Sequence, residues 1–464
     1  MKKLTNVTPS PEQLTIIKRV RPGAEVIRGA AGSGKTTTAA LKLRLMLMYF
    51  AARRTRMESA EPVRALVLTF NKTLRGYIKN LVEENVPAGK IELTVDTFRH
   101  WAYLTLGSPS IHDESHLTGL VGRHAAAVGL PSDFLLKECQ YLIGRFLPNN
   151  IDDYLSSRRD GRGASPRVER ATREAILSLI VRPYMDWKAQ NGYVDWNDAA
   201  VHLAGQKYHS YDIVVVDESQ DFSANELRAI MLQLADEHAV SFIIDTAQRI
   251  YARGFNWAEA GIGIRPETSH RLSVNYRNTP QIARLASGLM QCVVLDDDGT
   301  PPSLLDPLDG AATPVLLSGY FNAQVQWCID YIKAKVNLAN ESVAFLHPKG
   351  WFTYLRQQLT DSGLGYVEVT GQREWPEGDA NIALCTFHSA KGLDFDHVII
   401  IGLSEKSLPE GQFDLGDERF ETACRLLAMA IARARIQVVL GYKPSEESAL
   451  LQRLDRSAFV EVAV

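Results

Sequence analysis

Apolar residues are grouped along the chain in two different spacings, which predict alternating strands and helices. Short runs that are apolar at almost every position are typical of strands buried on both faces of a parallel sheet. In the first part of the chain such runs lie near Val26 and at 63–70, 91–95, 211–217 and 240–245. The stretch 37–48, shortly after the first run, has helical spacing instead. We therefore predict a parallel α/β sheet here.

The pattern changes twice further along the chain. From about 105 to 200 the apolar residues keep helical spacing without clear strands, most plainly at 168–187, which predicts a helical insertion into the first sheet. Beyond 271 the two kinds of run alternate again, which predicts a second α/β region. Its strand-like runs lie at 313–317, 342–346, 382–387, 397–402 and 437–442, and its helical stretches at 322–338, 350–362 and 418–434.

We therefore expect three structural units. The first α/β domain takes in residues 1–104 and 205–270, the helical insertion 105–204, and the second α/β domain 271–464. The segment 295–314, rich in Asp, Pro and Gly, is the most loop-like part of the chain. A chain of 464 residues is too long for one ordinary core, which agrees with this division.

Composition indicates a globular protein without a membrane segment. Hydrophobic residues make up 45% and charged residues 23%, both near average values. No apolar run approaches the roughly 20 residues needed to span a bilayer, and the lysines after Met1 precede no apolar core of a secretory signal. We therefore expect a cytoplasmic protein. The five cysteines (139, 292, 328, 385 and 424) form no CxxC pair, which favours reduced thiols over disulfides or a zinc site.

The net charge of −3 gives no overall attraction for nucleic acid, so any such contact is expected to be local. Two basic stretches are candidates. One is 53–56, and the other is 158–173, with arginines at 158, 159, 162, 167, 170 and 173 against only Asp160 and Glu169. Each is equally consistent with a solvated surface.

A phosphate loop is predicted at 29–36, where the sequence GAAGSGKT has the pattern GxxxxGK[ST]. It follows a predicted strand and opens a predicted helix, which is the context that this motif requires. The glycines let backbone N–H groups converge on phosphates, Lys35 reaches the β and γ oxygens, and the Thr36 hydroxyl ligates Mg²⁺. The expected nucleotide contacts of this segment are Gly29, Ala30, Ala31, Gly32, Ser33, Gly34, Lys35, Thr36 and Thr37.

Two carboxylates follow the predicted strand 211–217, in the sequence DESQD at 217–221. Ligands of open α/β sheets bind beyond the carboxyl ends of the strands. Asp217 is placed there to hold Mg²⁺ together with Thr36, and Glu218 to orient and deprotonate an attacking water. An acidic pair alone could be a surface turn, but behind a phosphate loop it supports a nucleotide site.

The DESQD segment resembles the DExQD motif of UvrD/Rep/PcrA-like superfamily 1 helicases, and other segments resemble that family's motifs in the same order along most of the chain. The most diagnostic is 386–395 (TFHSAKGLDF), similar to TxHxxKGLEF; 425–435 resembles RLxYVAxTRA and 195–198 resembles DFxDL. The resemblance assigns ATP contacts to Gln13 at adenine, Gln248 at the γ-phosphate, Tyr276 at the base, Arg277 and Arg433 as arginine fingers, and Asp394.

The same resemblance implies a site for single-stranded DNA. Segments 69–72 (TFNK) and 96–98 (DTF) resemble motifs that line the strand. Aromatic rings stack on bases of any sequence, worth about 1 to 3 kcal/mol per base, although burial in the core is the alternative for each ring. The expected DNA contacts are Phe70, Asn71, Thr97, Phe98, Tyr251, Arg253, Phe255, Trp257, His388 and Ser389.

Some positions depart from the family's pattern, although none of them removes a catalytic group. The stretch from Arg277 to His388 is too short for the large subdomain that full-length relatives insert there. The other departures are Ile244 at the glycine of GDxxQ, Arg99 at a histidine, Ala428 and Ala432 at a tyrosine and a threonine, and a shortened 251–255 run without its tryptophan.

Together these features predict two tandem RecA-like motor domains with ATP in the cleft between them. The resemblance implies an ATP hydrolase that uses Mg²⁺ and moves 3′ to 5′ on single-stranded or partly duplex DNA, as a translocase or helicase. The alternative is a regulatory ATPase subunit of a nuclease, repair or defence complex, active mainly with its protein partner. An inactive nucleic-acid-binding module is disfavoured because the expected catalytic residues are all present, namely Lys35, Asp217, Glu218, Gln248, Arg277 and Arg433.

Overall fold

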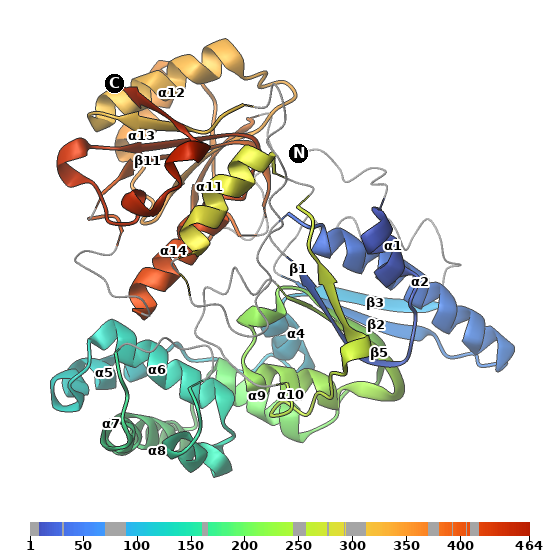
Figure 1. Ribbon diagram of the computed structural model, residues 1–464. Coiled ribbons are helices and arrows are strands. Elements are labelled where there is room, and N and C mark those ends of the chain that lie inside the picture. The colour runs from blue at the N-terminus through green and yellow to red at the C-terminus, as the bar shows by residue number, and fades with distance from the viewer. Residues whose placement is uncertain are drawn as a thin grey trace.

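Figure 1 shows the computed structural model, in which two α/β units and a group of helices are seen. The residues that it describes are 9–29, 32–69, 90–159, 166–244, 257–275, 278–291, 293, 312–369, 380–391, 393–404, 406–408 and 417–464.

Within these residues the first sheet has six strands, and every pair of neighbouring strands is parallel. Their order across the sheet is β3-β2-β4-β5-β1-β6, which places β5 between the strand before the phosphate loop and the strand before the acidic segment. The strands are β1 (Gly23–Gly29), β2 (Val63–Leu68), β3 (Ile91–Asp96), β4 (Tyr211–Val216), β5 (Leu234–Ile244) and β6 (Ser269–Leu272).

Helices cover both faces of this sheet (Figure 1). On one face α1 (Pro11–Ile17) and α2 (Lys35–Arg56) pack on the strands through an apolar core that contains Leu43 and Leu47. On the other face α4, α9 and α10 pack through a second core. These three helices are α4 (Phe98–Thr105), α9 (Trp196–Gly205) and α10 (Ala224–Leu232). The alternation of apolar runs therefore predicted the layers correctly.

A helical region with its own core lies between β3 and β4 in the chain. Polar contacts join it to the first domain. Arg145 forms a bidentate ion pair with Glu259, with distances of 2.9 and 2.7 Å. Its elements are α5 (Ser115–Val128), α6 (Ser132–Arg145), the 3₁₀ segment η1 (Pro148–Leu155), α7 (Arg170–Ile176), the π-helical turn η2 (Leu177–Val181) and α8 (Arg182–Asn191).

In the part of the chain that the structure describes, the second sheet has seven parallel strands in the order β13-β7-β12-β11-β8-β10-β9. Its faces are covered by α11 and α14 on one side and by α12 and α13 on the other. The strands are β7 (Val315–Ser318), β8 (Val343–His347), β9 (Val367–Glu368), β10 (Ile382–Thr386), β11 (Phe395–Leu403), β12 (Ala434–Tyr442) and β13 (Val460–Ala463). The helices are α11 (Pro280–Met290), α12 (Phe321–Lys335), α13 (Thr353–Asp361) and α14 (Glu418–Ile431).

The predicted α/β class, with two parallel sheets and a helical insertion in the first, is confirmed. Short strands with little buried apolar surface, such as β9 and β13, were not predicted. Strand β6 pairs with β1 as far as Leu272, so the first sheet continues two residues past the predicted boundary at 270. Short 3₁₀ turns are η3 (Ser219–Asp221), η5 (Pro266–Thr268), η6 (Pro444–Glu446), η7 (Leu451–Arg453) and η8 (Arg456–Ala458). Within the described ranges, no helix combines the length and the apolar character required to cross a bilayer.

Candidate nucleotide site between the two domains

The phosphate loop runs from the end of β1 to the start of α2. Gly32 and Gly34 have φ angles of +76° and +75°, in the left-handed region that favours glycine. The Lys35 ammonium donates to the Gly29 carbonyl at 2.8 Å, which folds the lysine back over the loop. Thr37 lies in the first turn of α2. Ala30, Ala31 and the side chain of Thr36 lie outside the described residues.

The loop suits a phosphate chain. Within the described residues, no side-chain hydrogen bond caps the amino end of α2, and the amino end of a long helix attracts anions. The Ser33 hydroxyl is buried and has no hydrogen-bond partner among the residues that the structure describes. A Cβ added to Gly29 would collide with this hydroxyl, so this conformation of the phosphate loop requires glycine at position 29. These features fit the triphosphate of ATP.

Gln13 is buried against this loop. Its Oε1 accepts from the Ser10 N–H at 2.9 Å, and its Nε2 donates to the Ser33 carbonyl at 3.0 Å. The glutamine therefore ties the start of α1 to the phosphate loop, next to Gly34, where an added Cβ would collide with Nε2. That it reads adenine stays a prediction.

Asp217 and Glu218 follow β4 at the same edge of the sheet. Asp217 is buried; its Oδ2 accepts from the Thr69 hydroxyl at 3.2 Å and its Oδ1 from the Glu218 N–H at 3.1 Å. Glu218 has a φ of +53°, which is rare for a residue with a side chain. Such strained backbone is commonly found at functional sites.

The two carboxyls have opposite pKa shifts. Burial and the charge of Glu218 raise the pKa of Asp217 to about 7. Burial also opposes ionisation of Glu218, but the positive charges of Lys391, Arg433 and Lys35 outweigh it, and the net pKa is lowered. Glu218 is thereby held as a carboxylate, the form that can take a proton from water. A buried carboxyl such as Asp217 is chemically suited to hold Mg²⁺.

Two basic residues of the second domain act on this acidic segment, Lys391 through direct contacts and Arg433 through its charge. Lys391 forms an ion pair with Asp221, and its ammonium lies 3.9 Å from Glu218 Oε2. Arg433 is buried, and its Nη1 lies 3.9 Å from Asp394 Oδ1. The structure therefore brings residues from the two domains together around Glu218. Gln248, Tyr276 and Arg277 lie outside the described residues.

The aromatic residues predicted to contact DNA differ in how deeply they are buried. Phe98 is 2% exposed and packs against Trp101 and Phe222, so its ring belongs to the core and has no free face for a base. Trp257 is half-buried, with its ring against Phe242. Phe70, Asn71, Tyr251, Arg253 and Phe255 lie outside the described residues.

The remaining predicted DNA contacts lie at strand ends. Thr97 caps α4 by accepting from the His100 N–H at 3.3 Å. His388 is exposed just after β10, and the Ser389 hydroxyl is hydrogen-bonded to Thr386 Oγ1 at 2.8 Å. His388 and Ser389 are thus placed on the surface loop that also carries Lys391.

Part of the basic stretch 158–173 is structural. Arg159 forms a two-pronged pair with Glu138, at 2.7 Å for both bonds, and Glu138 is fully buried. Arg173 donates to the carbonyls of Tyr154 and Ser157. For these two arginines neither alternative, a DNA contact or a solvated surface, describes the structure, because their charged groups bind partners inside the helical region.

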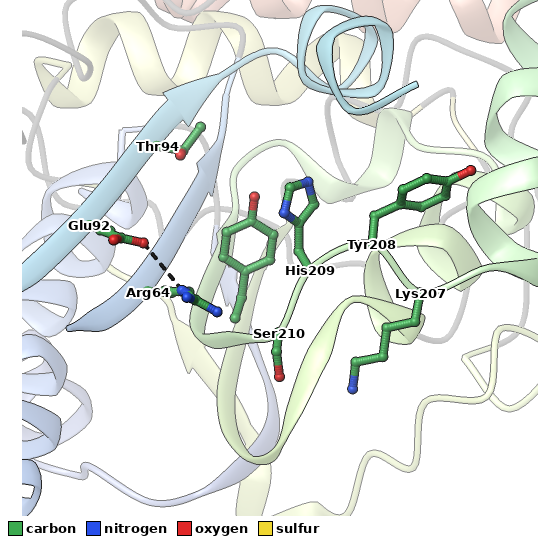
Figure 2. Close-up of a pocket in the computed structure, with 8 residues that line it drawn as sticks. Arg64, Glu92, Thr94, Lys207, Tyr208, His209 and Ser210 are labelled. Carbon is green, nitrogen blue, oxygen red and sulfur yellow. Dashed lines mark hydrogen bonds and ion pairs between the residues drawn. The ribbon is translucent and has the colours of Figure 1, made fainter. Parts of the chain in front are cut away.

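A separate pocket of about 660 Å³ lies at the opposite edge of the first sheet, where β2 and β4 begin (Figure 2). Two of its lining residues, Arg64 and Glu92, form an ion pair at 3.2 Å. None of the predicted site residues lines it. The lining residues are Arg64, Glu92, Thr94, Lys207, Tyr208, His209, Ser210 and Tyr211.

Sequence reasoning missed several groups at the interdomain site. Lys391 lies inside the diagnostic segment 386–395 but was not singled out. Asn275 and Asn278 flank the predicted base and phosphate contacts, and both are buried next to the phosphate loop. For Asn278 there was no local signal, because its partners are carbonyls far along the chain.

The second domain is similar to a known family. Residues 337–445 match the family model of the UvrD-like helicase C-terminal domain. We call this segment the UvrD-like domain. The UvrD-like domain contains β8 to β12, together with Lys391, Asp394 and Arg433. The resemblance to UvrD-like helicases is thereby confirmed.

Two further proteins are similar to this chain. A probable DNA helicase of Mycoplasma pneumoniae is 22% identical over 452 residues, which cover 89% of this chain and 79% of that protein. The crystal structure of the C-terminal domain of a possible DNA helicase from Lactobacillus plantarum matches with a TM-score of 0.30 and 18% identity, covering 40% of this chain and 98% of that one.

Proposed function

We propose that the chain is an ATP-dependent DNA helicase or translocase, moving 3′ to 5′ on single-stranded DNA. The observation that carries the proposal is the position of the Lys391 ammonium, in the UvrD-like domain, 3.9 Å from Glu218 beside the phosphate loop. The charge of Arg433, in the same domain, also lowers the pKa of Glu218. A cleft with a catalytic carboxylate on one wall and cations on the other can couple nucleotide hydrolysis to relative movement of the domains.

In this proposal the phosphate loop and Lys35 hold the triphosphate, and Gln13 and Tyr276 bind the adenine base. Thr36 and Asp217 hold Mg²⁺, which neutralises charge on the phosphates. Glu218 accepts the proton of the attacking water. Arg277 and Arg433 stabilise the charge that develops on the γ-phosphate, an effect worth roughly 10³ to 10⁵ in rate. Gln248 senses the γ-phosphate.

We place part of the DNA path on the carboxyl edge of the second sheet. Trp351 follows β8 and is 53% exposed, and the Lys349 ammonium lies 5.1 Å from its ring centre. Strand β8 neighbours β10, which leads to His388 and Ser389. An exposed ring beside a cation is suited to a base and its phosphate. The sequence 251–255 lacks the tryptophan of the family's pattern, and Trp351 is our candidate for a stacking surface elsewhere.

The decisive experiment measures ATP hydrolysis with and without single-stranded DNA. We expect the wild-type protein to be stimulated by DNA, and Lys35→Ala and Glu218→Gln to lose turnover. Partial duplexes with 3′ or 5′ tails then test unwinding and its direction. Hydrolysis that is indifferent to DNA would contradict the motor and favour the regulatory ATPase, with activity appearing in a complex with a partner such as a nuclease.

A further inference from the structure

Two asparagines lie in the segment that joins the two domains, between the end of β6 at Leu272 and the start of α11 at Pro280. Asn275 and Asn278 are 7% and 8% exposed. The Asn275 Nδ2 donates to Asn278 Oδ1 at 2.8 Å, and the Asn278 backbone N–H donates to Asn275 Oδ1 at 3.1 Å. The two side chains therefore form one closed hydrogen-bonded unit, which we call the asparagine pair.

The asparagine pair is hydrogen-bonded to the backbone of the second domain on both sides of Arg433. The Asn278 Nδ2 donates to the Ala432 carbonyl at 2.9 Å and to the Ala434 carbonyl at 2.5 Å. An amide nitrogen has two N–H donors, so this one is fully used. Because both carbonyls flank Arg433, the single amide fixes the backbone from which the arginine side chain extends.

The asparagine pair also rests directly on the phosphate loop. A Cβ added to Gly32 would collide with Asn275 Oδ1 and lie 2.9 Å from Asn278 Oδ1. The register of the first sheet explains this contact, because Gly29 pairs with Leu272 and both strands then continue past the same edge. A shift of the loop at Gly32 therefore meets Asn275 without any intervening side chain.

We propose that the asparagine pair is a positioning device that couples the phosphate loop to Arg433, with Asn278 as the positioning residue. The proposal rests on the proposed function, because it assigns Arg433 to the γ-phosphate. Closely packed groups move together. Occupation of the loop by phosphates thus sets the position of the Arg433 backbone through four hydrogen bonds between uncharged groups.

The test compares Asn278→Ala and the isosteric Asn278→Asp, both of which lose the two N–H donors, with wild type. Hydrolysis is measured with saturating single-stranded DNA, ground-state affinity with a fluorescent non-hydrolysable ATP analogue, and transition-state affinity with ADP and aluminium fluoride. We expect kcat to fall by about 10- to 100-fold, as a misplacement of the order of 1 Å produces. Affinity for the ATP analogue should stay within about twofold, while affinity for the transition-state mimic falls with kcat.

Asn225→Ala is the matched control. Asn225 is also buried, and its Nδ2 donates to two carbonyls, those of Ile143 and Phe146, at 3.0 and 3.1 Å, but at the junction with the helical region. This variant loses comparable contacts and should keep kcat. A double-mutant cycle with Arg433→Ala adds the decisive readout, since Asn278→Ala should lower kcat no further once Arg433 is gone.

The outcomes separate the two levels of the proposal. If wild type and Arg433→Ala hydrolyse ATP equally, the proposed function fails. If Arg433→Ala lowers kcat but both Asn278 variants keep full kcat, or if Asn278→Ala lowers kcat by the same factor with and without Arg433, the positioning role of the asparagine pair is overturned while the motor stands.

Discussion

Lys391 of the UvrD-like domain forms an ion pair with Asp221 of the first domain, and both side chains are largely buried. The same ammonium lies 3.9 Å from Glu218. One side chain therefore contributes to joining the two domains and to keeping the proposed general base ionised.

We expect Lys391→Met to weaken catalysis most at low pH. Removing the positive charge raises the pKa of Glu218, so the acidic limb of the kcat profile should move to higher pH. The loss in kcat should reach up to roughly 10²-fold, the lower end of what a general base contributes. Rates measured from pH 5.5 to 8.5 check this. Lys443→Met, which removes an exposed lysine paired with Glu446, should leave the profile in place.

Trp351→Ala should weaken binding of single-stranded DNA. A stacked base contributes about 1 to 3 kcal/mol, so the loss in affinity should be roughly 5- to 150-fold, and Trp351→Phe should restore much of it. Fluorescence anisotropy of a labelled oligothymidylate measures the affinity. Met57→Ala, at a residue that is 65% exposed on the first domain, is the control. Equal affinity of Trp351→Ala and wild type would remove Trp351 from the DNA path.

Arg159→Ala should destabilise the helical region rather than reduce DNA binding. It leaves the Glu138 carboxylate buried without its cation, which typically destabilises a protein by about 3 to 5 kcal/mol. Denaturant unfolding measures this loss, and the salt dependence of DNA affinity should keep its slope. Arg170→Ala, at an exposed pair with Glu174, should stay within about 0.5 kcal/mol of wild type. If Arg159→Ala instead flattens the salt dependence of DNA affinity and leaves the free energy of unfolding unchanged, Arg159 contacts DNA and has no structural role.

His347 should make part of the stability depend on pH. Burial and the nearby Lys349 lower its pKa from 6.5 to about 4, and its Nδ1 accepts from the backbone N–H groups of Lys349 and Trp351. As the pH falls, His347 therefore becomes protonated in the unfolded chain at a higher pH than in the folded protein. The neutral His347 side chain contributes at most about 3 kcal/mol to the free energy of unfolding. This contribution is fully present above pH 6.5 and is lost by about pH 4.

Comparison with His347→Gln isolates this contribution from other titrating groups. The difference in unfolding free energy between wild type and variant should be largest at pH 7 and should shrink steadily toward pH 4. A difference that is constant across this range would mean that His347 does not titrate as its surroundings indicate.

The sequence predicted those features whose chemistry is local. The phosphate loop and the Asp217–Glu218 pair each depend on neighbouring residues and on the strand before them, and the structure places both at one edge of the first sheet. The buried strands were visible because runs such as 211–217 are apolar at almost every position.

Features that depend on a distant partner were not predictable. Asn278 contacts the Ala432 carbonyl 154 residues away, and a backbone acceptor leaves no trace in the sequence. Arg159 looks like a surface charge until Glu138 is found buried beside it. Phe98 and Trp351 are both aromatic, but tertiary packing alone decides that the first is in the core and the second on the surface.

The topology of the first sheet also has a consequence for the order of folding during synthesis. Strand β1 pairs with β5 and β6, which are separated from it in the chain by the whole helical region. During synthesis β1 can therefore pair with both neighbours only after the chain has been made as far as Leu272. Pairing between strands so far apart in the sequence is slow. The helical region, whose core is made of residues close in sequence, can form earlier and hold the ends of the split sheet near each other.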